Sequence, residues 1–501
     1  MNLMMLLEMA ASGFGDRVAF QNGEATLSFQ QLFEAAGGAA RRISDSGCER
    51  VALLDVNSLA LPVAVFGSAW AGIPFSPLNY RLTGSELEAL AERIAPSFLI
   101  SDAARVEELA GLPGAALVGR GDFLAQAQAA PRPEDDWGMD GDAIAILLFT
   151  SGTTGAPKAA VIRHKHLVSY ILGSVEFGAA SEDDAALVCV PPYHIAGMAA
   201  IASSVYAGRR VVQLENFSPE AWIETVRKQA ITNAFVVPTM LVRIIETLEK
   251  EGRADFPALR AISYGGGKMP LPVIQKAMAF FPETDFTNAY GLTETSSTIA
   301  ILSPADHRAA VASEDPAVQR RLTSVGLPLP SVEVEIRDED GQAVAAGEHG
   351  EICVRGEQVS GEYLEKGSLL DDDGWFPTRD GGFLDREGFL FVDGRVDDVI
   401  VRGGENLSPG EIEDVLLEHA GVRDCAVVGM PDEQWGEMVV AVVVSDAAVS
   451  ADEAALQEWV KDRLRSSRVP SRIAFWAELP YNEIGKLLRR SVKARLGENA
   501  S

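Results

Sequence analysis

Cysteine is scarce in this 501-residue chain, and its distribution argues against two classes of protein. No two cysteines form a Cys-x-x-Cys pair, so neither a metal cluster nor a disulfide framework is expected. A reducing compartment fits this usage, and we predict a cytoplasmic protein. The four positions are Cys48, Cys189, Cys353 and Cys425.

Basic residues are also in short supply. The chain has 43 Lys and Arg against 72 Asp and Glu, which gives a formal net charge of −29. Such a surface repels phosphate backbones and anionic headgroups, so neither nucleic acid nor an anionic membrane is expected as a main partner. Any polyanionic ligand must therefore be attracted by local cations rather than by the whole molecule.

Hydrophobic runs long enough to cross a bilayer are lacking. The uncharged run Leu59–Phe75 is too short and too interrupted, and we expect it to form a buried helix and strand. Residues 1–15 contain no basic residue before Glu8, so a secretory signal peptide is not expected. The interruptions of the uncharged run are Pro62, Gly67, Gly72 and Pro74.

The residues that are present indicate α/β domains. A chain of 501 residues with 47% hydrophobic residues is too long for one core, so at least two domains are expected. Leu27–Ile43 has helical spacing and precedes a short strand at Arg50–Asp55, and Ala116–Val118 and Ala186–Val190 are further strand candidates. Strands separated by helices predict stacked layers with mainly parallel sheets.

The pattern changes in the second half of the chain. Residues 129–142 and 303–321 are polar and interrupted by proline, which predicts loops. From Ser331 onward, short strands with turns predict a β-rich subdomain. After Arg395 we expect a small α+β domain.

Two helices of this small domain have start signals. Ser408 followed by Pro409 is typical of a helix start, and Gly421 is expected to end that helix. A second helix is expected to start at Ser450, with Glu453 completing a capping box.

One loop follows a predicted buried strand, Ala143–Phe149, and has the composition that binds polyphosphate. Its glycines let backbone N–H groups approach phosphate oxygens, its hydroxyls add donors, and its lysine adds a positive charge. A Walker A loop would end in Gly-Lys-Ser/Thr, and this loop does not. The alternative is a surface turn between two strands. The loop consists of Thr150, Ser151, Gly152, Thr153, Thr154, Gly155, Ala156, Pro157 and Lys158.

Seven further motifs follow in the order that one enzyme superfamily shows. They are Pro192-Tyr193-His194, Tyr264-Gly265-Gly266-Gly267, Asn288-Ala289-Tyr290-Gly291-Leu292-Thr293-Glu294, Thr378-Arg379-Asp380, Gly394-Arg395-Val396-Asp397, Gly403-Gly404-Glu405-Asn406, and Pro480 with Gly485-Lys486. With the loop, they resemble the adenylate-forming superfamily of acyl-CoA synthetases, aryl-CoA ligases, peptide-synthetase adenylation domains and luciferases. The chain departs from the usual Thr-Gly-Asp at Arg379, but the carboxylate position, Asp380, is retained.

The resemblance implies a fold, an activity and a two-domain division. Residues 1–396 would form a large multi-layer α/β domain with mainly parallel sheets and a β-rich subdomain. Residues 397–501 would form a small mobile α+β domain, with a hinge at Asp397. The implied reaction joins a carboxylic acid to ATP, giving acyl-AMP and pyrophosphate. CoA then gives acyl-CoA and AMP, and Mg²⁺ assists the first step.

The resemblance also assigns a nucleotide site. The loop from Thr150 to Gly155, with Lys158, would hold the β- and γ-phosphates. Thr293 would contact the α-phosphate, and Glu294 would bind Mg²⁺, because carboxylate and phosphate oxygens suit a hard cation. Simpler alternatives are a core aromatic at Tyr290 and a surface ion pair between carboxylate and arginine. The adenine and ribose contacts would be Gly265, Gly266, Gly267, Asn288, Ala289, Tyr290, Gly291, Asp380 and Arg395.

The C-terminal domain would supply different groups to the two half-reactions. Lys486 is the main catalytic candidate, because a lysine that bridges the carboxylate and the α-phosphate would stabilise the transition state of the first step. Rotation about Asp397 would then withdraw Lys486 and bring Gly403 and Gly404 to the site as a narrow path for CoA. Trp435 resembles a position that packs near CoA, and a plain core tryptophan is the alternative.

The acid pocket is expected around the Pro-Tyr-His motif. His194 resembles the residue that separates the acid pocket from the thiol tunnel. The small residues of the expected pocket leave room for an aromatic or medium-chain acid, and no aspartate in residues 193–198 is placed to hold an amino-acid ammonium. The expected pocket residues are Tyr193, His194, Ala196, Gly197, Gly265, Gly267 and Asn288.

Alternatives remain for the activity. An acyl-AMP ligase that hands its product to a carrier protein, a luciferase-like oxidase and a non-catalytic nucleotide-binding scaffold share the motifs. No carrier domain follows Ser501, which favours a free acceptor such as CoA. The acid and the oligomeric state, monomer or homodimer, remain open.

Overall fold

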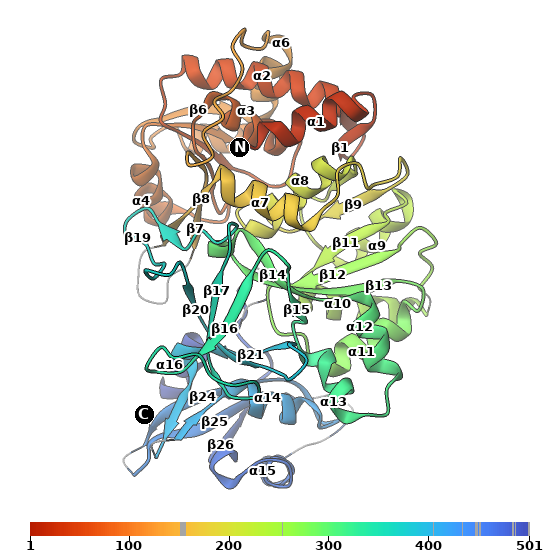
Figure 1. Ribbon diagram of the computed structural model, residues 1–501, viewed down its shortest axis with the longest axis vertical. Helices are drawn as coiled ribbons and strands as arrows, with labels where there is room; N and C mark the ends of the chain where they lie inside the picture. Colours follow the sequence, from red (N-terminus) through yellow and green to blue (C-terminus); the bar gives the residue numbers. More distant parts are fainter. Residues whose placement is uncertain are drawn as a thin grey trace.

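The computed structural model describes residues 1–150, 157–252, 254–403, 405–432, 434–445, 449, 452–482, 485 and 487–498. Figure 1 shows the N-terminal helices at one end of the molecule, a β-rich part in the middle and the last hundred residues at the other end. The mixed α/β class predicted from the sequence is confirmed. In the described residues, no helix is long and apolar enough to span a membrane.

The first large sheet has nine strands, and three of the sequence motifs lie on its strands or shortly after them. Its central strands are parallel, whereas β2, β14 and β15 run antiparallel to their neighbours. In spatial order the strands are β15 (Leu327–Pro328), β14 (Ser297–Leu302), β13 (Asp285–Leu292), β12 (Ala261–Gly265), β11 (Asn233–Val236), β9 (Ala185–Val188), β10 (Arg210–Gln213), β1 (Val18–Asn22) and β2 (Ala25–Ser28).

The second large sheet has eight strands and carries the two ends of the phosphate-type loop. Its centre is parallel, and the β7–β8 hairpin and the β18–β19 hairpin add antiparallel strands. In spatial order the strands are β19 (Gly367–Ser368), β18 (Glu362–Tyr363), β8 (Lys158–Arg163), β7 (Ile144–Thr150), β4 (Phe75–Pro77), β3 (Arg50–Leu54), β5 (Ser97–Ser101) and β6 (Ala115–Gly119).

One core joins the two sheets through the helices that lie between them. It combines buried residues of β1 and β10 with residues of β3 and β7. The helix predicted at Leu27–Ile43 starts with a capping box between Ser28 and Gln31, which satisfies N–H groups of its first turn. The helices of this core are α1 (Met4–Phe14), α2 (Phe29–Asp45), α3 (Ala60–Ala71), α6 (Arg120–Ala129), α7 (His164–Ser174) and α8 (Ile195–Ala207).

A second core lies under the nine-stranded sheet, and a third lies beside the second large sheet. The second packs α9 (Pro219–Lys228), α10 (Pro238–Glu251) and α11 (Leu271–Phe280) on β9, β11 and β12. The third contains α4 (Gly84–Ile94) and borders the short α5 (Ala103–Glu108). These helices fix where each parallel strand ends, and the site residues follow those ends.

The predicted β-rich subdomain is confirmed, but one loop prediction beside it is wrong. The four-stranded antiparallel sheet runs β16 (Glu333–Arg337), β17 (Gly350–Arg355), β20 (Phe376–Leu384) and β21 (Leu390–Arg395). Residues 303–321, expected as a loop, form α12 (Pro304–Ala312), α13 (Pro316–Gln319) and part of η2 (Arg320–Thr323). Each proline there occupies a first-turn position, where it favours a helix, and Ser303 caps α12.

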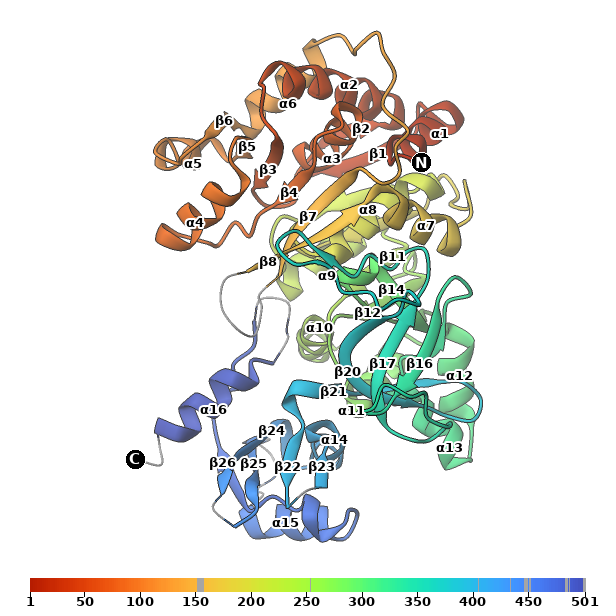
Figure 2. The same ribbon diagram turned by 60° about the vertical axis from the view of Figure 1, so that its left-hand side comes forward.

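The last hundred residues have their own sheet and cores. The sheet order is β23 (Glu405–Leu407), β22 (Ile400–Arg402), β25 (Gly436–Ser445) and β24 (Val422–Asp432), with β26 (Arg472–Phe475) also on β25. Helix α14 (Pro409–Leu417) packs on one face and α16 (Arg489–Glu498) on the other, as the two separate cores show. Figure 2 shows this part at the bottom of the molecule, below the N-terminal sheets.

The predicted start of α14, with Ser408 at the N-cap and Pro409 in the first turn, is confirmed, but its predicted end at Gly421 and the predicted start of the next helix are wrong. Ser408 is at the N-cap position of α14, but its hydroxyl donates to the Asp393 carbonyl (3.3 Å), and the helix ends at Leu417. Helix α15 (Glu453–Lys461) is capped by Asp452, whose carboxylate accepts from the Ala455 N–H at 2.8 Å. The predicted cap, Ser450, lies outside the described residues.

Candidate active site

The parallel strands of the nine-stranded sheet end at a common edge. Strands β9, β11, β12 and β13 are parallel neighbours, so their carboxyl ends lie together. The segments that leave this edge are Pro191–His194, Val237–Thr239, Gly265–Gly267 and Gly291–Glu294. Ligands of open α/β sheets bind at such an edge. The topology therefore brings the predicted acid-pocket and adenine-site motifs together.

The glycine segment lies tightly against the neighbouring strand. Gly265 pairs with Ala289, and a Cβ at Gly265 would lie 2.2 Å from the Ala289 carbonyl oxygen. Any side chain at this position would force β12 and β13 apart. Asn288, one residue earlier on β13, is buried, and its amide donates to the Ser324 carbonyl at 3.1 Å. These contacts hold the backbone predicted to border adenine.

Tyr290, Asp380 and Arg395 form one hydrogen-bonded group. The Tyr290 hydroxyl donates to Asp380 Oδ2 at 2.7 Å, and Arg395 donates to Asp380 Oδ1 at 2.9 Å. Burial and the negative charge of Asp380 raise the pKa of Tyr290, which keeps its phenol a donor. Asp380 is buried, and its carboxylate has lone pairs left for further donors such as ribose hydroxyls.

The predicted phosphate side of the site lies where β7 and β8 meet β18. Thr150 pairs with Lys158 in the β7–β8 register, and the Lys158 ammonium lies 5.7 Å from the ring centre of Tyr363. Tyr363 donates a hydrogen bond to Glu294, and both Ser360 and Gly361 donate backbone N–H groups to the Glu294 carbonyl. The predicted contacts Ser151, Gly152, Thr153, Thr154 and Gly155 lie outside the described residues.

Glu294 has the chemistry of a magnesium ligand. It lies on the 3-10 turn η1 (Thr293–Thr295), directly after β13, and presents carboxylate oxygens. Burial and Glu294 together raise the pKa of Tyr363, so the phenol remains a donor to this carboxylate. An oxygen ligand beside a phosphate site fits Mg²⁺, which usually binds through one or two carboxylates and the phosphates of its substrate.

Aromatic rings lie close together in the segment predicted to form the acid pocket. Tyr193 is buried, its ring lies 5.6 Å from that of Tyr80 and 4.5 Å from that of His194. His194 is the N-cap residue of α8, so Ala196 and Gly197 form the first turn of that helix. The rings of Tyr193 and His194 therefore precede α8, and the small residues Ala196 and Gly197 lie in its first turn.

The C-terminal part reaches this edge through the turn at Gly485. Gly485 has a φ of +69°, and a Cβ there would lie 2.2 Å from Thr239 Oγ1, at the start of α10. A Cβ at Gly267 would lie 3.9 Å from the Gly485 carbonyl oxygen and equally close to the Pro238 ring. Lys486 itself lies outside the described residues. Its immediate neighbour nevertheless lies at the carboxyl edge, beside the adenine segment.

A second contact joins the two parts. Lys268, directly after the glycine segment, donates to Asp414 at 2.7 Å and to the Gly410 carbonyl at 3.3 Å. Both partners are on α14 of the C-terminal part. Thr239, Lys268 and Tyr363 were not predicted, because each is a common residue type outside the motifs. The position of Lys268 beside Gly267 is the one available sequence signal.

Gly403 and Trp435, two of the residues predicted for the CoA path, contact each other. Gly403 donates its N–H to the Trp435 carbonyl at 2.8 Å, and a Cβ at Gly403 would lie 2.8 Å from the Trp435 ring. Trp435 is 47% exposed, so it is not the plain core tryptophan of the alternative. Gly404 lies outside the described residues. The role of this surface stays a prediction.

Comparison with known proteins assigns a family. The AMP-binding enzyme family matches residues 7–364, and the AMP-binding enzyme C-terminal domain matches residues 411–486. A 2-succinylbenzoate–CoA ligase of Bacillus licheniformis is 33% identical over 484 residues, which cover 95% of this chain and 96% of the relative. The fatty acid–[acyl-carrier-protein] ligase ScoC of Streptomyces coeruleorubidus is 32% identical over 494 residues, 95% and 93% of the two chains.

Solved structures agree over almost the whole length. The o-succinylbenzoate CoA synthetase of Bacillus subtilis, in complex with its acyl-adenylate intermediate, has a TM-score of 0.84 at 30% identity and covers 97% of each chain. ATP-bound MatB of Rhodopseudomonas palustris has a TM-score of 0.88 at 25% identity and covers 100% of each chain. The chain therefore belongs to the AMP-binding enzyme family, in the adenylate-forming superfamily of acyl-CoA and aryl-CoA ligases that its motifs predicted.

Proposed function

We propose that this enzyme is an AMP-forming acid–CoA ligase whose acid is aromatic, with 2-succinylbenzoate as the first substrate to test. The observation that carries the proposal is the convergence, at one sheet edge, of the Tyr290–Asp380–Arg395 group, Glu294 and the Gly485 turn. The relatives named as 2-succinylbenzoate–CoA ligases support the choice of acid. The rings of Tyr193 and His194, followed by the small residues Ala196 and Gly197, suit an aromatic substrate.

In the first half-reaction, a carboxylate oxygen of the acid attacks the α-phosphorus of ATP, and the bond to pyrophosphate breaks. Two anions approach each other in this step, so the site must supply positive charge and fixed donors. We assign Asp380 and Arg395 to the ribose, Tyr290 and residues 265–267 to adenine, and residues 150–155 with Lys158 to the β- and γ-phosphates. Thr293 and Lys486 are assigned to the α-phosphate. Bound Mg²⁺, held by Glu294, would neutralise phosphate charge.

In the second half-reaction, the CoA thiol attacks the acyl carbonyl. A carbon–sulfur bond forms, the carbon–oxygen bond to AMP breaks, and the thiol proton is lost to solvent. We assign His194 to the boundary between acid and thiol, and Gly403, Gly404 and Trp435 to the CoA path after a rotation at Asp397. This division, 1–396 and 397–501, agrees with the separate cores on either side of Asp397.

The acceptor has a second candidate. The ScoC relative is named for an acyl-carrier protein, and it is almost as similar to this chain as the CoA ligase relatives are. We therefore keep transfer to a carrier protein as the alternative. A cytoplasmic location agrees with the four free, buried cysteines, and a homodimer stays a proposal without a contact to support it.

The test is pyrophosphate release with ATP and Mg²⁺ across a panel of acids, each with CoA, with a carrier protein and with neither. The panel contains 2-succinylbenzoate, benzoates, cinnamates and fatty acids of several lengths. The expected result is fastest turnover with an aromatic acid in the presence of CoA, with AMP and the thioester as products. Turnover that needs the carrier protein would select the alternative, and a preference for fatty acids would contradict the aromatic assignment.

A further inference from the structure

Arg379 has a backbone conformation that suits glycine better. Its φ is +63°, in the left-handed region that long side chains rarely adopt. The usual superfamily motif has glycine here, so this chain has exchanged the easier residue for a strained one. Backbone strain of this kind persists only where surrounding contacts hold it, and it is often associated with function.

The strain arises at a β-bulge between β17 and β20. Glu351 pairs with Gly381 and Cys353 pairs with Pro377, so residues 378–380 all face Ile352. The Thr378 hydroxyl donates to the Ile352 carbonyl at 2.7 Å, and the Arg379 N–H donates to Glu351 Oε1 at 3.0 Å. A bulge redirects side chains. Here it turns Asp380 toward Tyr290 and Arg395, and Arg379 toward a different partner.

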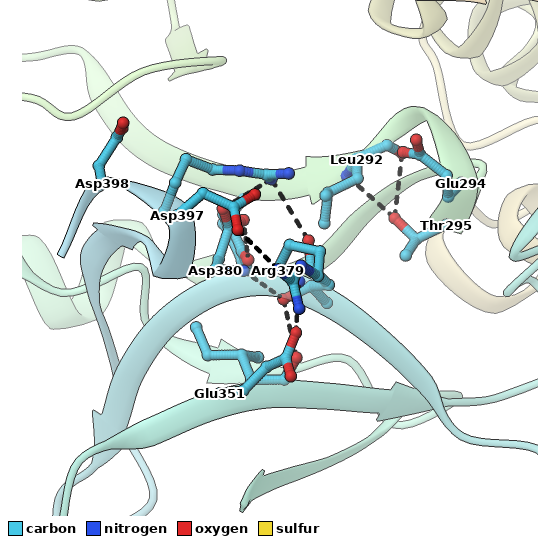
Figure 3. Close-up of polar contacts among 12 residues, drawn as sticks. Leu292, Glu294, Thr295, Glu351, Arg379, Asp380, Asp397 and Asp398 are labelled. Carbon is cyan, nitrogen blue, oxygen red and sulfur yellow. Dashed lines mark hydrogen bonds and ion pairs between the residues drawn. The ribbon is translucent and has the colours of Figure 1, made fainter. Parts of the chain in front are cut away.

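That partner is Asp397, in the segment that connects the two parts of the chain. Arg379 donates to Asp397 Oδ1 at 2.6 Å, and Figure 3 shows Asp397 turned toward Arg379 while Asp398 points away. Asp397 lies on η3 (Val396–Asp398). Leu390, six residues before η3, is in an N-terminal core, and Ile400, two residues after it, is in a C-terminal core.

The neighbouring aspartate holds the other part. Asp398 pairs with Arg489 of α16 at 3.4 Å, and Arg489 also makes two hydrogen bonds to the buried carboxylate of Glu413, at 2.7 and 2.8 Å. Adjacent carboxylates thus tie the connecting segment to opposite sides. Arg379 reaches this segment from the bulge that also carries Asp380, so the bulge supports both the proposed nucleotide site and the connecting segment.

We infer that Arg379 is a positioning residue which, through Asp397, holds the two parts of the chain in the arrangement that brings the Gly485 turn to the nucleotide site. Its kinetic consequence rests on the proposed function. Removing the guanidinium favours other arrangements, so acyl-AMP formation slows and thioester formation from preformed acyl-AMP speeds up. The two side chains are 51% and 49% exposed, so each change is expected to be about two- to five-fold and to shrink at high salt.

The test compares Arg379→Ala, Arg379→Gly and Arg379→Lys with Arg355→Ala. The glycine variant removes the side chain and the strain together, and the lysine variant keeps a cation. Arg355 is the matched control, because it forms an exposed ion pair with Glu333 in the same sheet. Fluorophores on Glu283→Cys and Glu478→Cys, both at exposed positions, report the distance between the two parts. The native cysteines are free but buried, so the labels go to the new sites.

The expected result is a shifted transfer efficiency in Arg379→Ala and Arg379→Gly without any substrate, partial recovery in Arg379→Lys, and none of these changes in Arg355→Ala. The half-reactions then move in opposite directions in the alanine and glycine variants. Asp397→Asn should add nothing to Arg379→Ala. An unchanged transfer efficiency, or half-reactions reduced by one common factor, would overturn the inference. If no acid supports turnover, the proposed function fails while the distance measurement still decides the role of Arg379.

Discussion

In the N-terminal part, the predicted nucleotide contacts lie on strands and bond to one another, whereas the C-terminal groups lie in turns between elements. Asp380 on β20 receives one hydrogen bond from Arg395 on the neighbouring β21 and one from Tyr290 on β13 of the nine-stranded sheet. The Gly485 turn and the Gly403–Trp435 surface are held by the small domain, and Lys268–Asp414 is one of the few ties across. Strands fix geometry, and turns at a domain edge allow exchange. This difference supports the proposal that one nucleotide site is served in turn by Lys486 and by the Gly403–Trp435 surface.

The largest expected effect comes from replacing Lys486, the proposed catalytic residue of acyl-AMP formation. Lys486→Ala removes the proposed cation at the α-phosphate and should slow acyl-AMP formation about 10²- to 10³-fold, as the loss of a transition-state donor does. Thioester formation from preformed acyl-AMP should remain within a small factor of wild type. Single-turnover assays of each half-reaction make the comparison. Equal losses in both half-reactions would show that Lys486 and the CoA-path residues do not serve separate steps.

The next largest effect concerns Asp380, in the proposed nucleotide site. Asp380→Ala leaves the Tyr290 hydroxyl and Arg395 without their carboxylate, which should cost about 1–3 kcal/mol of unfolding free energy. ATP affinity should fall about ten-fold or more, and both half-reactions should suffer, because AMP occupies the same site in each. Calorimetric ATP titration and urea unfolding measure these quantities. Glu333→Ala, which removes an exposed carboxylate of the same sheet, is the control expected to change neither.

A smaller effect is expected from a substitution in the turn at Gly485. Gly485→Ala adds a Cβ to a residue in the left-handed region, which should cost about 1–2 kcal/mol, and it also adds a clash with Thr239 that exists only in this arrangement. Acyl-AMP formation should fall roughly ten-fold, and thioester formation should not. Gly388→Ala is the control, since Gly388 also has a positive φ (+86°) but its Cβ would meet Leu327 at an ordinary van der Waals distance of 3.8 Å. Equal rates of acyl-AMP formation in the two variants would contradict a role for the contact between Gly485 and Thr239.

The smallest effect concerns stability of the N-terminal core. Burial lowers the pKa of His164 to about 4, and its Nδ1 accepts a hydrogen bond from the Leu3 N–H at 3.3 Å. Between pH 6.5 and 4 the unfolded chain binds a proton there that the folded chain does not, so stability falls as the pH falls, by up to about 1.4 kcal/mol per pH unit.

His164→Gln should reduce the dependence of the unfolding free energy on pH between pH 6.5 and 4. Urea unfolding followed by tryptophan fluorescence reports it, because Trp70 and Trp137 are in the same core as the residues around His164. The C-terminal cores contain no part of this contact, so their transition should show the same pH dependence in both proteins. A slope unchanged by the substitution would contradict the assignment of the proton to His164.

The sequence predicted the site better than it predicted the contacts between the two parts. Asp380, Arg395 and Tyr290 lie within short motifs, so motif order was sufficient to predict them, although Asp380 and Arg395 meet through the antiparallel pair β20–β21. Tyr363, Thr239 and Lys268 act through partners 69 to 246 residues away, as the pairs Tyr363–Glu294 and Gly485–Thr239 show. No local pattern marks such a contact.

Local signals misled at two kinds of position. Proline in residues 303–321 predicted a break, but proline at the first turn starts α12 and α13. Arg379 was interpreted as a neutral departure because the carboxylate beside it is retained. Its left-handed φ and its bond to Asp397 become visible only when the bulge has set the direction of its side chain.

The central claim, one fixed site served by two arrangements, is tested most directly by locking the arrangement seen here. Lys268→Cys and Asp414→Cys replace the ion pair across the interface, and a short bis-maleimide can join them because the four native cysteines are buried. The locked enzyme should form acyl-AMP and release one equivalent of pyrophosphate, yet form no thioester with CoA. The unlinked double variant should do both. Thioester formation at the full rate in the locked enzyme would contradict the account.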